Sequence, residues 1–329
     1  MTNTRFAVLG AGSWGTAVAM HLSMNQARVL LWGRDESHVH AMAKSRENSR
    51  YLPGLRFPDA LIPEASLDAC ICEATHLIIA VPSHAFSGLL QQLPNTIQHL
   101  AWITKGLDPK NNQCLSELVT EKFGEDFPMA IISGPSFAKE VAKGLPTALV
   151  IAGNNTQYMQ ALHDALHINH LRAYFSHDLI GVQCAGAVKN VLAIACGISD
   201  GLNYGANAKA ALITRGLAEM ARLGTALGGI AETFTGLSGL GDLVLTCTDN
   251  QSRNRRFGLL VGEGKAIADA EQSIGQVVEG KHNAGQVSAL AKKHKLELPI
   301  CAEVNALLQG KISAEDAVQN LFSRPPKEE

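Results

Sequence analysis

A glycine-rich turn near the start of the chain places the strongest constraint on its fold. The apolar run Phe6–Leu9 predicts a short strand and Thr16–Met24 predicts a helix, with Gly10-Ala-Gly-Ser-Trp-Gly15 between them. In such a G-x-G-x-x-G turn the first glycine allows a tight turn, the second lets backbone approach a pyrophosphate, and the third lets the helix pack on the strand. N–H groups at the helix start then bind the phosphates. We predict a dinucleotide site at Gly10, Gly12 and Gly15, against the alternative of a glycine-rich turn without a ligand.

Apolar runs continue to alternate with helical segments as far as residue 180. One of them, Leu77–Val81, contains no alternating polar residues, which is typical of a parallel strand buried on both faces. Strands that alternate with helices predict an α/β domain with a doubly wound, Rossmann-like, mostly parallel sheet. The other strands that we expect are Ala27–Trp32, Ala101–Thr104, Met129–Ile132, Ala148–Ala152 and Leu171–Phe175.

Ligands bind at the carboxyl ends of the strands in such a sheet. This rule singles out Ser83, Lys105 and the turn Gly134–Ser136. We expect Lys105 to contact an anion, although a solvated surface lysine is the alternative. The second strand is followed by Arg34, which suits a 2′-phosphate or can lie on an adenine ring. Asp35 keeps NAD possible, so the strand end favours NADP or both cofactors.

The strand pattern stops at Ile180, and long segments rich in alanine and leucine follow. A chain of 329 residues is long enough for two domains. We expect a dinucleotide-binding Rossmann-like domain over residues 1–180 and an all-helical substrate and catalytic domain over residues 181–329. The helices that we expect in the second domain are Cys184–Ile198, Ala206–Leu223, Arg255–Val261, Gly280–His294, Ile300–Leu308 and Ala314–Phe322.

The helix Cys184–Ile198 is apolar on every side except at Lys189 and Asn190. A helix without a polar face belongs inside a protein. A lysine there must find a partner or lose its charge, and such amines serve as general acids or bases. The alternative is that Lys189 reaches an edge of the helix and only makes a salt bridge.

Polar groups elsewhere in the helical half are candidates to meet Lys189. Asp242 follows the glycine cluster Gly236–Gly241 and is a natural counter-ion for a buried lysine, with a helix N-cap as the alternative. The segment Ser252-Arg-Asn254 offers hydroxyl, guanidinium and amide donors, which suit a phosphate; a solvated arginine face is the alternative. The glycines at both ends of Gly275–Gly280 predict a short extended segment before a helix.

Composition excludes several classes of function. The 28 basic and 30 acidic residues give no electrostatic case for binding nucleic acid or an anionic membrane. Seven scattered cysteines form neither a disulfide framework nor a zinc site, and they favour the cytosol. No uninterrupted apolar run approaches the roughly 20 residues that span a bilayer, so no stable membrane insertion is expected. The helically spaced His163, His167 and His170 are interpreted as a surface cluster, and no metal is expected.

Seven motifs occur in an order that resembles one family. They are Gly10-Ala-Gly-Ser-Trp-Gly-Thr-Ala, Thr104-Lys-Gly-Leu, Gly134-Pro-Ser-Phe-Ala, Ala187-Val-Lys-Asn, Gly239-Leu-Gly-Asp-Leu, Ser252-Arg-Asn and Val278-Glu-Gly. Together they resemble the bacterial-type NAD(P)-dependent glycerol-3-phosphate dehydrogenases from Gly10 to Gly280. The resemblance implies reduction of dihydroxyacetone phosphate to sn-glycerol 3-phosphate for phospholipid synthesis, with NADP or NAD. The family is often dimeric, so we expect a homodimer, and the cysteine content places it in the cytoplasm.

The resemblance also implies roles for individual residues. Lys189 would exchange a proton with the C2 oxygen. The chemistry of that step adds that Asp242 would orient Lys189 and that Asn190 would hold the substrate or the lysine. The residues implied to line the substrate are Lys105, Gly134, Ser136, Lys189, Asp242, Ser252, Arg253 and Asn254. Besides the three glycines, those implied to contact the cofactor are Ser13, Trp14, Arg34, Lys105, Ala138, Arg253, Val277 and Glu279.

Two alternatives stay open at this point. One is a β-hydroxy-acid dehydrogenase of the same two-domain plan, whose lysine and asparagine lie a helical turn apart, whereas Lys189 and Asn190 are adjacent here. The other is a nucleotide sensor without catalytic activity, which the presence of Lys189, Asp242 and Arg253 disfavours.

Overall fold

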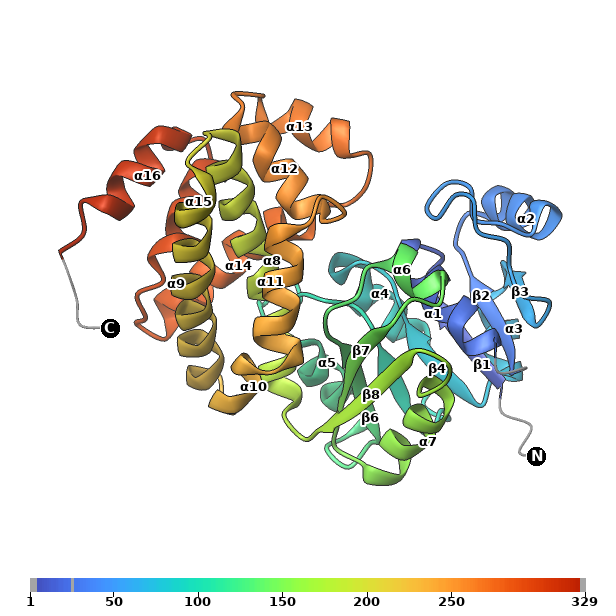
Figure 1. Cartoon of the computed structure of the whole chain (residues 1–329). Coiled ribbons are helices and arrows are strands. Elements are labelled where there is room, and N and C mark those ends of the chain that lie inside the picture. The colour runs from blue at the N-terminus through green and yellow to red at the C-terminus, as the bar shows by residue number, and fades with distance from the viewer. Residues whose placement is uncertain (1–4, 25–26, 326–329) are drawn as a thin grey trace. The chain divides into compact units, whose positions relative to one another are not determined.

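The computed structural model describes residues 5–24 and 27–325. The chain divides into two compact units, each with its own hydrophobic core (Figure 1). The α/β unit comprises Met1–Lys105 and Leu115–Leu179, and the helical unit comprises Gly106–Cys114 and Ile180–Glu329.

The α/β unit is built on one eight-stranded sheet. Its strands are β1 (Arg5–Leu9), β2 (Arg28–Trp32), β3 (Leu61–Glu64), β4 (His76–Ile79), β5 (Leu100–Trp102), β6 (Met129–Ser133), β7 (Thr147–Gly153) and β8 (Leu171–Ser176). They lie in the order β3-β2-β1-β4-β5-β6-β7-β8, and only the β6–β7 pair is antiparallel. The predicted doubly wound, mostly parallel sheet is confirmed.

Strand β3 is absent from the predicted set. It has four residues, includes Pro63, and pairs only with β2 at the edge of the sheet. Proline cannot donate to a ladder, so it is tolerated at an edge but removes the sequence signal of a strand. The sheet therefore extends one strand further than the apolar runs indicate.

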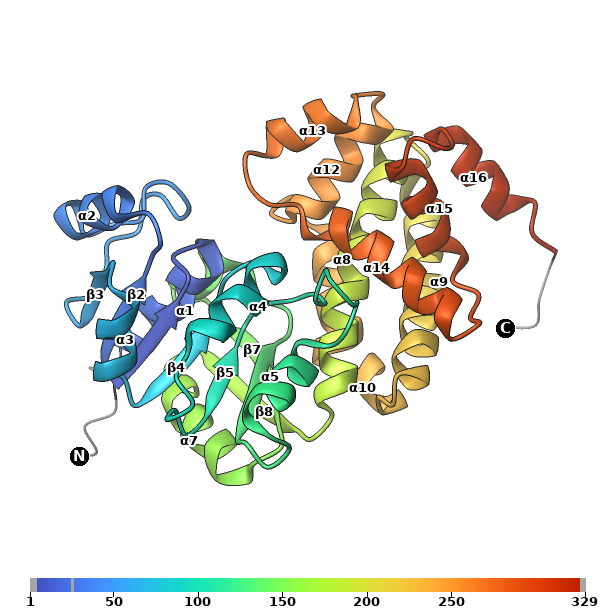
Figure 2. The same cartoon turned by 180° about the vertical axis from the view of Figure 1, so that it is seen from behind.

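Helices cover both faces of this sheet. They are α1 (Ser13–Ser23), α2 (Glu36–Ser45), α3 (Leu67–Glu73), α4 (Ser83–Gln92), α5 (Leu115–Phe123), α6 (Ala138–Ala142) and α7 (Thr156–Leu166). Helix α1 packs against α6 and α7, while α4 packs against α5; Figures 1 and 2 show these two groups from opposite sides. Because α1 is buried along nearly its whole length, the glycine turn before it is held rigidly.

The helical unit contains ten helical segments among the described residues. They are α8 (Leu179–Gly201), α9 (Gly205–Ala226), α10 (Ala231–Thr235), the π-helical turn η1 (Leu237–Gly241), α11 (Asp242–Thr248), α12 (Arg253–Gly262), α13 (Ile267–Ile274), α14 (Glu279–Lys293), α15 (Pro299–Leu308) and α16 (Ala314–Phe322). The predicted all-helical character is confirmed. The short elements α10, η1, α11 and α13 are missing from the prediction, which treats Gly236–Gly241 only as an interruption.

Helix α8 is the central element of the helical unit. At 23 residues it is long and apolar enough to cross a membrane by length and composition, but 89% of its apolar window is buried inside the protein. It is longer than the predicted Cys184–Ile198 because Leu179–Gln183 and Ser199–Gly201 extend it at both ends. Its burial, together with Lys189 and Asn190 in its middle, identifies it as a core helix.

Glycines let α8 and α12 touch backbone to backbone. A Cβ on Gly197 would lie 2.1 Å from the carbonyl oxygen of Arg255, and one on Gly258 would lie 2.2 Å from that of Ile194. One turn further, Gly201 and Gly262 repeat the contact. No larger side chain fits such a crossing, so the glycine spacing on the two helices fixes which residues of α12 lie beside α8.

The segment Gly106–Cys114 packs with the helical unit, apart from the chain on either side of it. It lies within the predicted range 1–180, yet it belongs to the helical unit. Leu107 and Cys114 are part of the helical core, and the Leu107 carbonyl accepts a hydrogen bond of 3.0 Å from the Gln286 side chain. The segment has no periodic pattern of its own, so only its tertiary contacts assign it.

Candidate active site

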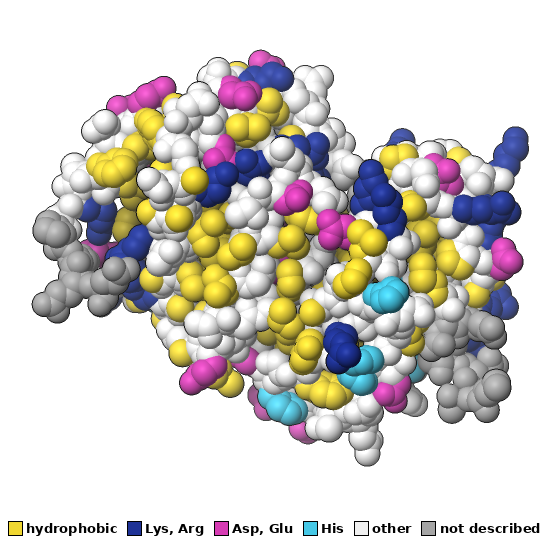
Figure 3. Space-filling model, in the orientation of Figure 1, with side chains coloured by type: hydrophobic (Ala, Val, Ile, Leu, Met, Phe, Trp, Pro, Cys, Tyr) yellow, Lys and Arg dark blue, Asp and Glu magenta, His cyan; other side chains and the backbone are white. Residues whose placement is uncertain are grey.

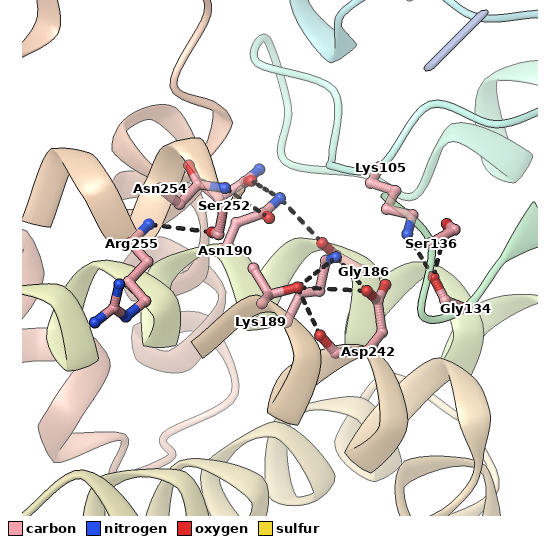
Figure 4. A network of polar contacts seen from close by, with 12 residues as sticks. Lys105, Gly134, Ser136, Gly186, Lys189, Asn190, Asp242, Ser252, Asn254 and Arg255 are labelled. Atoms are coloured by element: carbon pink, nitrogen blue, oxygen red, sulfur yellow. Dashed lines mark hydrogen bonds and ion pairs between the residues drawn. The ribbon is translucent and has the colours of Figure 1, made fainter. Parts of the chain in front are cut away.

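Lys189 lies at the centre of a buried polar cluster in the helical unit (Figure 4). Its Nζ donates to Asp242 Oδ1 at 2.6 Å and to Thr246 Oγ1 at 3.0 Å. The side chains of Lys189 and Asp242 are only 8% and 1% exposed. An opposite charge at this distance favours the cationic form of a buried amine. The predicted counter-ion contact is therefore present, and the lysine does not reach solvent at an edge of α8.

The π-helical turn before α11 brings Asp242 to this position. A Cβ on Gly239 would lie 2.1 Å from the Phe234 carbonyl oxygen, so the tight turn requires glycine there. The N-cap of α11 is Gly241 and makes no side-chain cap bond, so the N-cap alternative for Asp242 is wrong. Asp242 is instead the first residue of the helix, and its carboxylate points to the lysine. π-Helical turns recur at functional sites.

Thr246 completes the cluster and is missing from the predicted site. It lies one turn after Asp242 on α11, and its hydroxyl donates to the Asp242 carbonyl at 2.6 Å while accepting from Lys189. This hydroxyl thus ties the amine to the helix that carries its counter-ion. The only feature of the sequence that could have predicted Thr246 is its i, i+4 spacing from Asp242. This spacing places the two side chains on one face only if the segment is known to be a helix.

A row of buried amides begins at Asn190. Its Oδ1 accepts from Asn254 Nδ2 at 2.8 Å, and its Nδ2 donates to Gly186 O at 3.2 Å and to Asn283 Oδ1 at 3.4 Å. Asn283 in turn donates to Gln286 at 3.0 Å. Because both hydrogens of the Asn190 amide are used, its oxygen is the end available to a further donor. The structure therefore joins the predicted residues Asn190 and Asn254, and adds Asn283 and Gln286 behind them.

The amide row also fixes the first turn of α14. The N–H of Gly280 donates to Asn254 Oδ1 at 2.9 Å. A Cβ on Gly280 would lie 2.5 Å from the Asn190 carbonyl oxygen, so α14 approaches α8 as closely as α12 does. The predicted residues Val277 and Glu279 lie at this junction, and Glu279 is the first residue of α14.

Arg253 and Arg255, two of the three clustered arginines of α12, have different surroundings. Arg253 donates to Gln276 Oε1 at 3.1 Å; burial lowers its pKa, and the Glu279 carboxylate opposes that shift. Arg255 is buried and pairs with Asp200 and Asn250, so it has a structural partner. Arg253 is the first residue of α12, and the Ser252 hydroxyl caps that helix by accepting from the Arg255 N–H.

The α/β unit carries the predicted dinucleotide turn. A Cβ on Gly10 would meet Ala80 backbone at 2.7 Å and one on Gly15 would meet Gly10 O at 2.0 Å, whereas Gly12 faces open space. Helix α1 begins without a side-chain cap, so its first N–H groups are not satisfied by a side chain of the cap residue. The buried Trp14 indole N–H likewise has no hydrogen-bond partner among the described residues. These features fit a bound pyrophosphate.

The remaining predicted residues of the α/β unit lie at strand ends. Lys105 Nζ and the Ser136 hydroxyl both donate to the Gly134 carbonyl, at 3.0 and 3.1 Å (Figure 4). Ala138 is the first residue of α6, and Ser13 donates to the Tyr51 carbonyl at 2.7 Å. The predicted group Lys105, Gly134 and Ser136 thus comes together within this unit.

Arg34 and Asp35 follow strand β2 and differ in their contacts. Arg34 is exposed. Asp35 caps α2, and hydrogen bonds from the Ser37 hydroxyl and the His38 N–H, with the Arg50 charge, lower its pKa to about 2. The carboxylate that could bind a ribose is therefore engaged by its own helix.

Comparison with known proteins identifies the family. The model of the NAD-dependent glycerol-3-phosphate dehydrogenase N-terminus matches residues 5–159, and the model of the C-terminus of the same enzymes matches residues 178–319. The chain belongs to the NAD-dependent glycerol-3-phosphate dehydrogenase family. The resemblance drawn from the seven motifs is confirmed.

Individual relatives of this dehydrogenase family cover the whole chain. The glycerol-3-phosphate dehydrogenase (NAD(P)+) of Legionella pneumophila strain Philadelphia 1 is 60% identical, with 100% of each chain covered. The crystal structure of glycerol-3-phosphate dehydrogenase from Coxiella burnetii is 49% identical, with a TM-score of 0.95 over 98% of this chain and 99% of that one. A ketopantoate reductase from Ralstonia eutropha, 14% identical with a TM-score of 0.59 over 96% and 100% of the two chains, shares the fold alone.

Proposed function

We propose that this chain reduces dihydroxyacetone phosphate to sn-glycerol 3-phosphate, reversibly and with NADPH or NADH. The observation that supports it most is the buried Lys189–Asp242–Thr246 cluster in a member of this dehydrogenase family. In the same proposal residues 1–180 bind the dinucleotide, while residues 181–329 bind substrate and supply the proton. The product would supply phospholipid synthesis in the cytoplasm, and the chain would act as a homodimer.

Lys189 would perform the proton chemistry. A dinucleotide held by the Gly10–Gly15 turn would supply the hydride for C2 of the substrate. Negative charge would then grow on the C2 oxygen. A cationic amine hydrogen-bonded to this oxygen stabilises that charge and then donates the proton. Asp242 and Thr246, at 2.6 and 3.0 Å from Nζ, fix the direction in which the amine donates. In the reverse direction the neutral amine takes the proton back.

Arg253 and Asn254 would bind the substrate phosphate at the start of α12. A guanidinium, an amide and the positive end of a helix suit a dianion. The glycine crossing of α8 and α12 holds this helix end beside Asn190, whose oxygen can accept from a substrate hydroxyl. Binding the phosphate away from C2 positions the reacting carbon, so it contributes to turnover as well as affinity.

NADP(H) is the cofactor that this proposal favours. Arg34 is exposed after β2 and suits a 2′-phosphate, whereas the Asp35 carboxylate is held by Ser37, His38 and Arg50. Comparison of KM for NADPH and NADH tests this part. An Arg34→Ala variant should raise KM for NADPH and leave KM for NADH nearly unchanged.

The substrate assignment is tested by a panel of ketones. Oxidation of NADPH should be fast with dihydroxyacetone phosphate and negligible with 2-keto and 3-keto acids, which the alternative β-hydroxy-acid dehydrogenase would reduce. Arg253→Ala should raise KM for dihydroxyacetone phosphate by about 100-fold, the effect of losing about 3 kcal/mol of charged hydrogen bonding. An unchanged KM would contradict the phosphate site, and equal turnover of a keto acid would contradict the reaction.

A further inference from the structure

Strand β2 is followed by a carboxylate at the position that NAD-binding sites use. Asp35 follows Gly15 by about 20 residues, the spacing at which an acid binds the 2′-hydroxyl of the adenosine ribose in an NAD site. The same acid repels the 2′-phosphate of NADP, because both groups are negative. A chain that prefers NADP(H), as proposed above, therefore needs a group that compensates the charge of Asp35.

Hydrogen bonds keep this carboxylate ionised and occupied. Its Oδ1 accepts from the Ser37 hydroxyl at 2.6 Å and from the His38 N–H at 3.1 Å, and its Oδ2 accepts from Arg50 Nη1 at 3.0 Å. The bond from Ser37, with those from His38 and Arg50, lowers the pKa of Asp35 to about 2, so the group is charged throughout the neutral range. The partners in α2 are a hydroxyl and a peptide group, whereas Arg50 brings a positive charge.

The loop that carries Arg50 is fastened to the glycine turn before α1. Asn48, which is fully buried, lies two residues before Arg50 in the loop that follows α2. Its Nδ2 donates to the Ala11 carbonyl at 3.0 Å and to Thr16 Oγ1 at 2.8 Å, and its Oδ1 accepts from the Tyr51 N–H at 3.2 Å. One buried amide thus joins the phosphate-binding turn to the residues around Arg50.

Tyr51 holds the loop on the other side of Arg50. Its carbonyl accepts from the Ser13 hydroxyl at 2.7 Å, and its ring centroid lies 5.9 Å from Arg50 Cζ. Arg50 is therefore held between two residues that are bound to the glycine turn. The side chains of Arg50 and Asp35 remain 55% and 47% exposed, so this ion pair contributes little to folding and faces solvent, from which a ligand arrives.

The ion pair leaves a second arginine available at the same strand end. Arg34, next to Asp35 in the sequence, is exposed and has no ion pair within residues 5–24 and 27–325. Because Asp35 is already paired with Arg50, it does not draw Arg34 away from a ligand. Figure 3 shows further Lys and Arg side chains on the surface of the α/β unit around α2. Arg34 thus keeps its guanidinium for a phosphate.

We propose that Arg50 is a positioning residue that sets cofactor specificity by neutralising Asp35. With Arg50 in place, the strand end accepts a 2′-phosphate beside Arg34. Without Arg50, the ionised Asp35 has an oxygen for the 2′-hydroxyl of NAD and repels the 2′-phosphate of NADP. The inference rests on the dinucleotide site of the proposed function and deepens its preference for NADP(H).

Dinucleotide affinity tests this role without turnover. The Kd values of NADPH and NADH follow from the fluorescence of the reduced nicotinamide, and that of adenosine 2′,5′-bisphosphate follows from calorimetry. Arg50→Ala should raise the Kd of NADPH and of the bisphosphate about 10-fold, since one unit charge near a phosphate dianion is worth about that factor in water. The Kd of NADH should stay unchanged or fall. Arg50→Lys keeps the charge and should bind NADPH nearly as the wild type does.

Lys44→Ala is the charge-matched control. It removes one positive charge from the last turn of α2, about 13 Å along the helix from Asp35 and beyond the Debye length of about 8 Å. Its Kd for NADPH should equal that of the wild type. Circular dichroism and the urea midpoint check that each variant is folded.

A double variant separates neutralisation from a structural role. Asp35→Asn keeps the Oδ1 that caps α2, because asparagine caps helices as well as aspartate does, and it removes the charge. In Asp35→Asn/Arg50→Ala no unpaired carboxylate remains, so the Kd of NADPH should return close to that of the wild type. A double variant as weak as Arg50→Ala would overturn the role. So would an unchanged Kd of NADPH in Arg50→Ala, or equal weakening of NADPH and NADH.

Activity keeps the two proposals apart. A wild type that binds NADPH more tightly than Arg50→Ala does, but does not reduce dihydroxyacetone phosphate, would refute the proposed reaction and support the role of Arg50. An enzyme that reduces this substrate, and whose preference for NADPH over NADH survives in Arg50→Ala, would refute the role and leave the reaction standing.

Discussion

Removing the charge of Asp242 should reveal how strongly the buried lysine depends on it. At 2.6 Å the Coulomb attraction between the two groups is about 6 kcal/mol for an effective dielectric constant of about 20. Much of it offsets the cost of taking both charges out of water. In Asp242→Asn this cost remains for Lys189 alone, so we expect the variant to lose about 3–5 kcal/mol of stability. The neutral amine also becomes more favourable, so kcat should fall.

A double-mutant cycle isolates this coupling. Lys189→Met removes the cationic partner of Asp242 and should also destabilise, whereas the double variant carries neither buried charge and should be more stable than the sum of the two effects predicts. Urea unfolding followed by circular dichroism reports on the helices. The three tryptophans, Trp14, Trp32 and Trp102, all lie in the α/β unit, so their fluorescence is an internal reference. Additive effects, within about 0.5 kcal/mol, would refute the reasoning.

Three further predictions concern single positions. Thr246→Val removes a hydrogen bond to a charged group worth about 1.5–3 kcal/mol, so kcat should fall about 10- to 100-fold while KM for dihydroxyacetone phosphate changes little; steady-state kinetics measures both. Gly258→Ala would place a Cβ 2.2 Å from the Ile194 carbonyl oxygen. We therefore expect the free energy of unfolding in urea to fall by about 1–3 kcal/mol, and KM for dihydroxyacetone phosphate to rise because α12 moves. An unchanged urea midpoint would contradict the close crossing of α8 and α12. Burial, and secondarily the His99 charge, lowers the pKa of His76 from 6.5 to about 4. The unfolded chain then binds the proton first, so stability should fall as pH drops from about 6.5 to about 4, and less so in His76→Phe, as acid titration of tryptophan fluorescence would show.

The elements that the sequence predicts well are those whose signal is local. The glycine turn before α1, the apolar runs of the parallel strands and the apolar helix α8 each follow from composition and spacing alone. The contact between Lys189 and Asp242 can be predicted for a related reason. A charged side chain in an apolar setting needs a partner, and the helical half of the sequence offers few candidates. The order of the seven motifs along the chain then predicts the family.

Other features of the site depend on contacts that no short stretch encodes. Thr246 becomes significant only once α11 places it one turn from Asp242 and beside Lys189. Asn283 and Gln286 look like surface positions of an ordinary helix, yet they are buried behind Asn190. Strand β3 and the segment Gly106–Cys114 likewise owe their places to partners far along the chain. In each case tertiary contacts determine where the residue or segment lies, and the local sequence contains no pattern that predicts it.

The most direct test of the central claim is the turnover of Lys189→Ala with dihydroxyacetone phosphate and NADPH. Loss of the proton donor should lower kcat by about 100-fold or more, while the Kd of NADPH, measured by fluorescence, stays close to that of the wild type. Added methylamine should restore part of the activity, because it supplies the missing amine and does nothing for a merely structural defect. Turnover within a few-fold of the wild type would contradict the account.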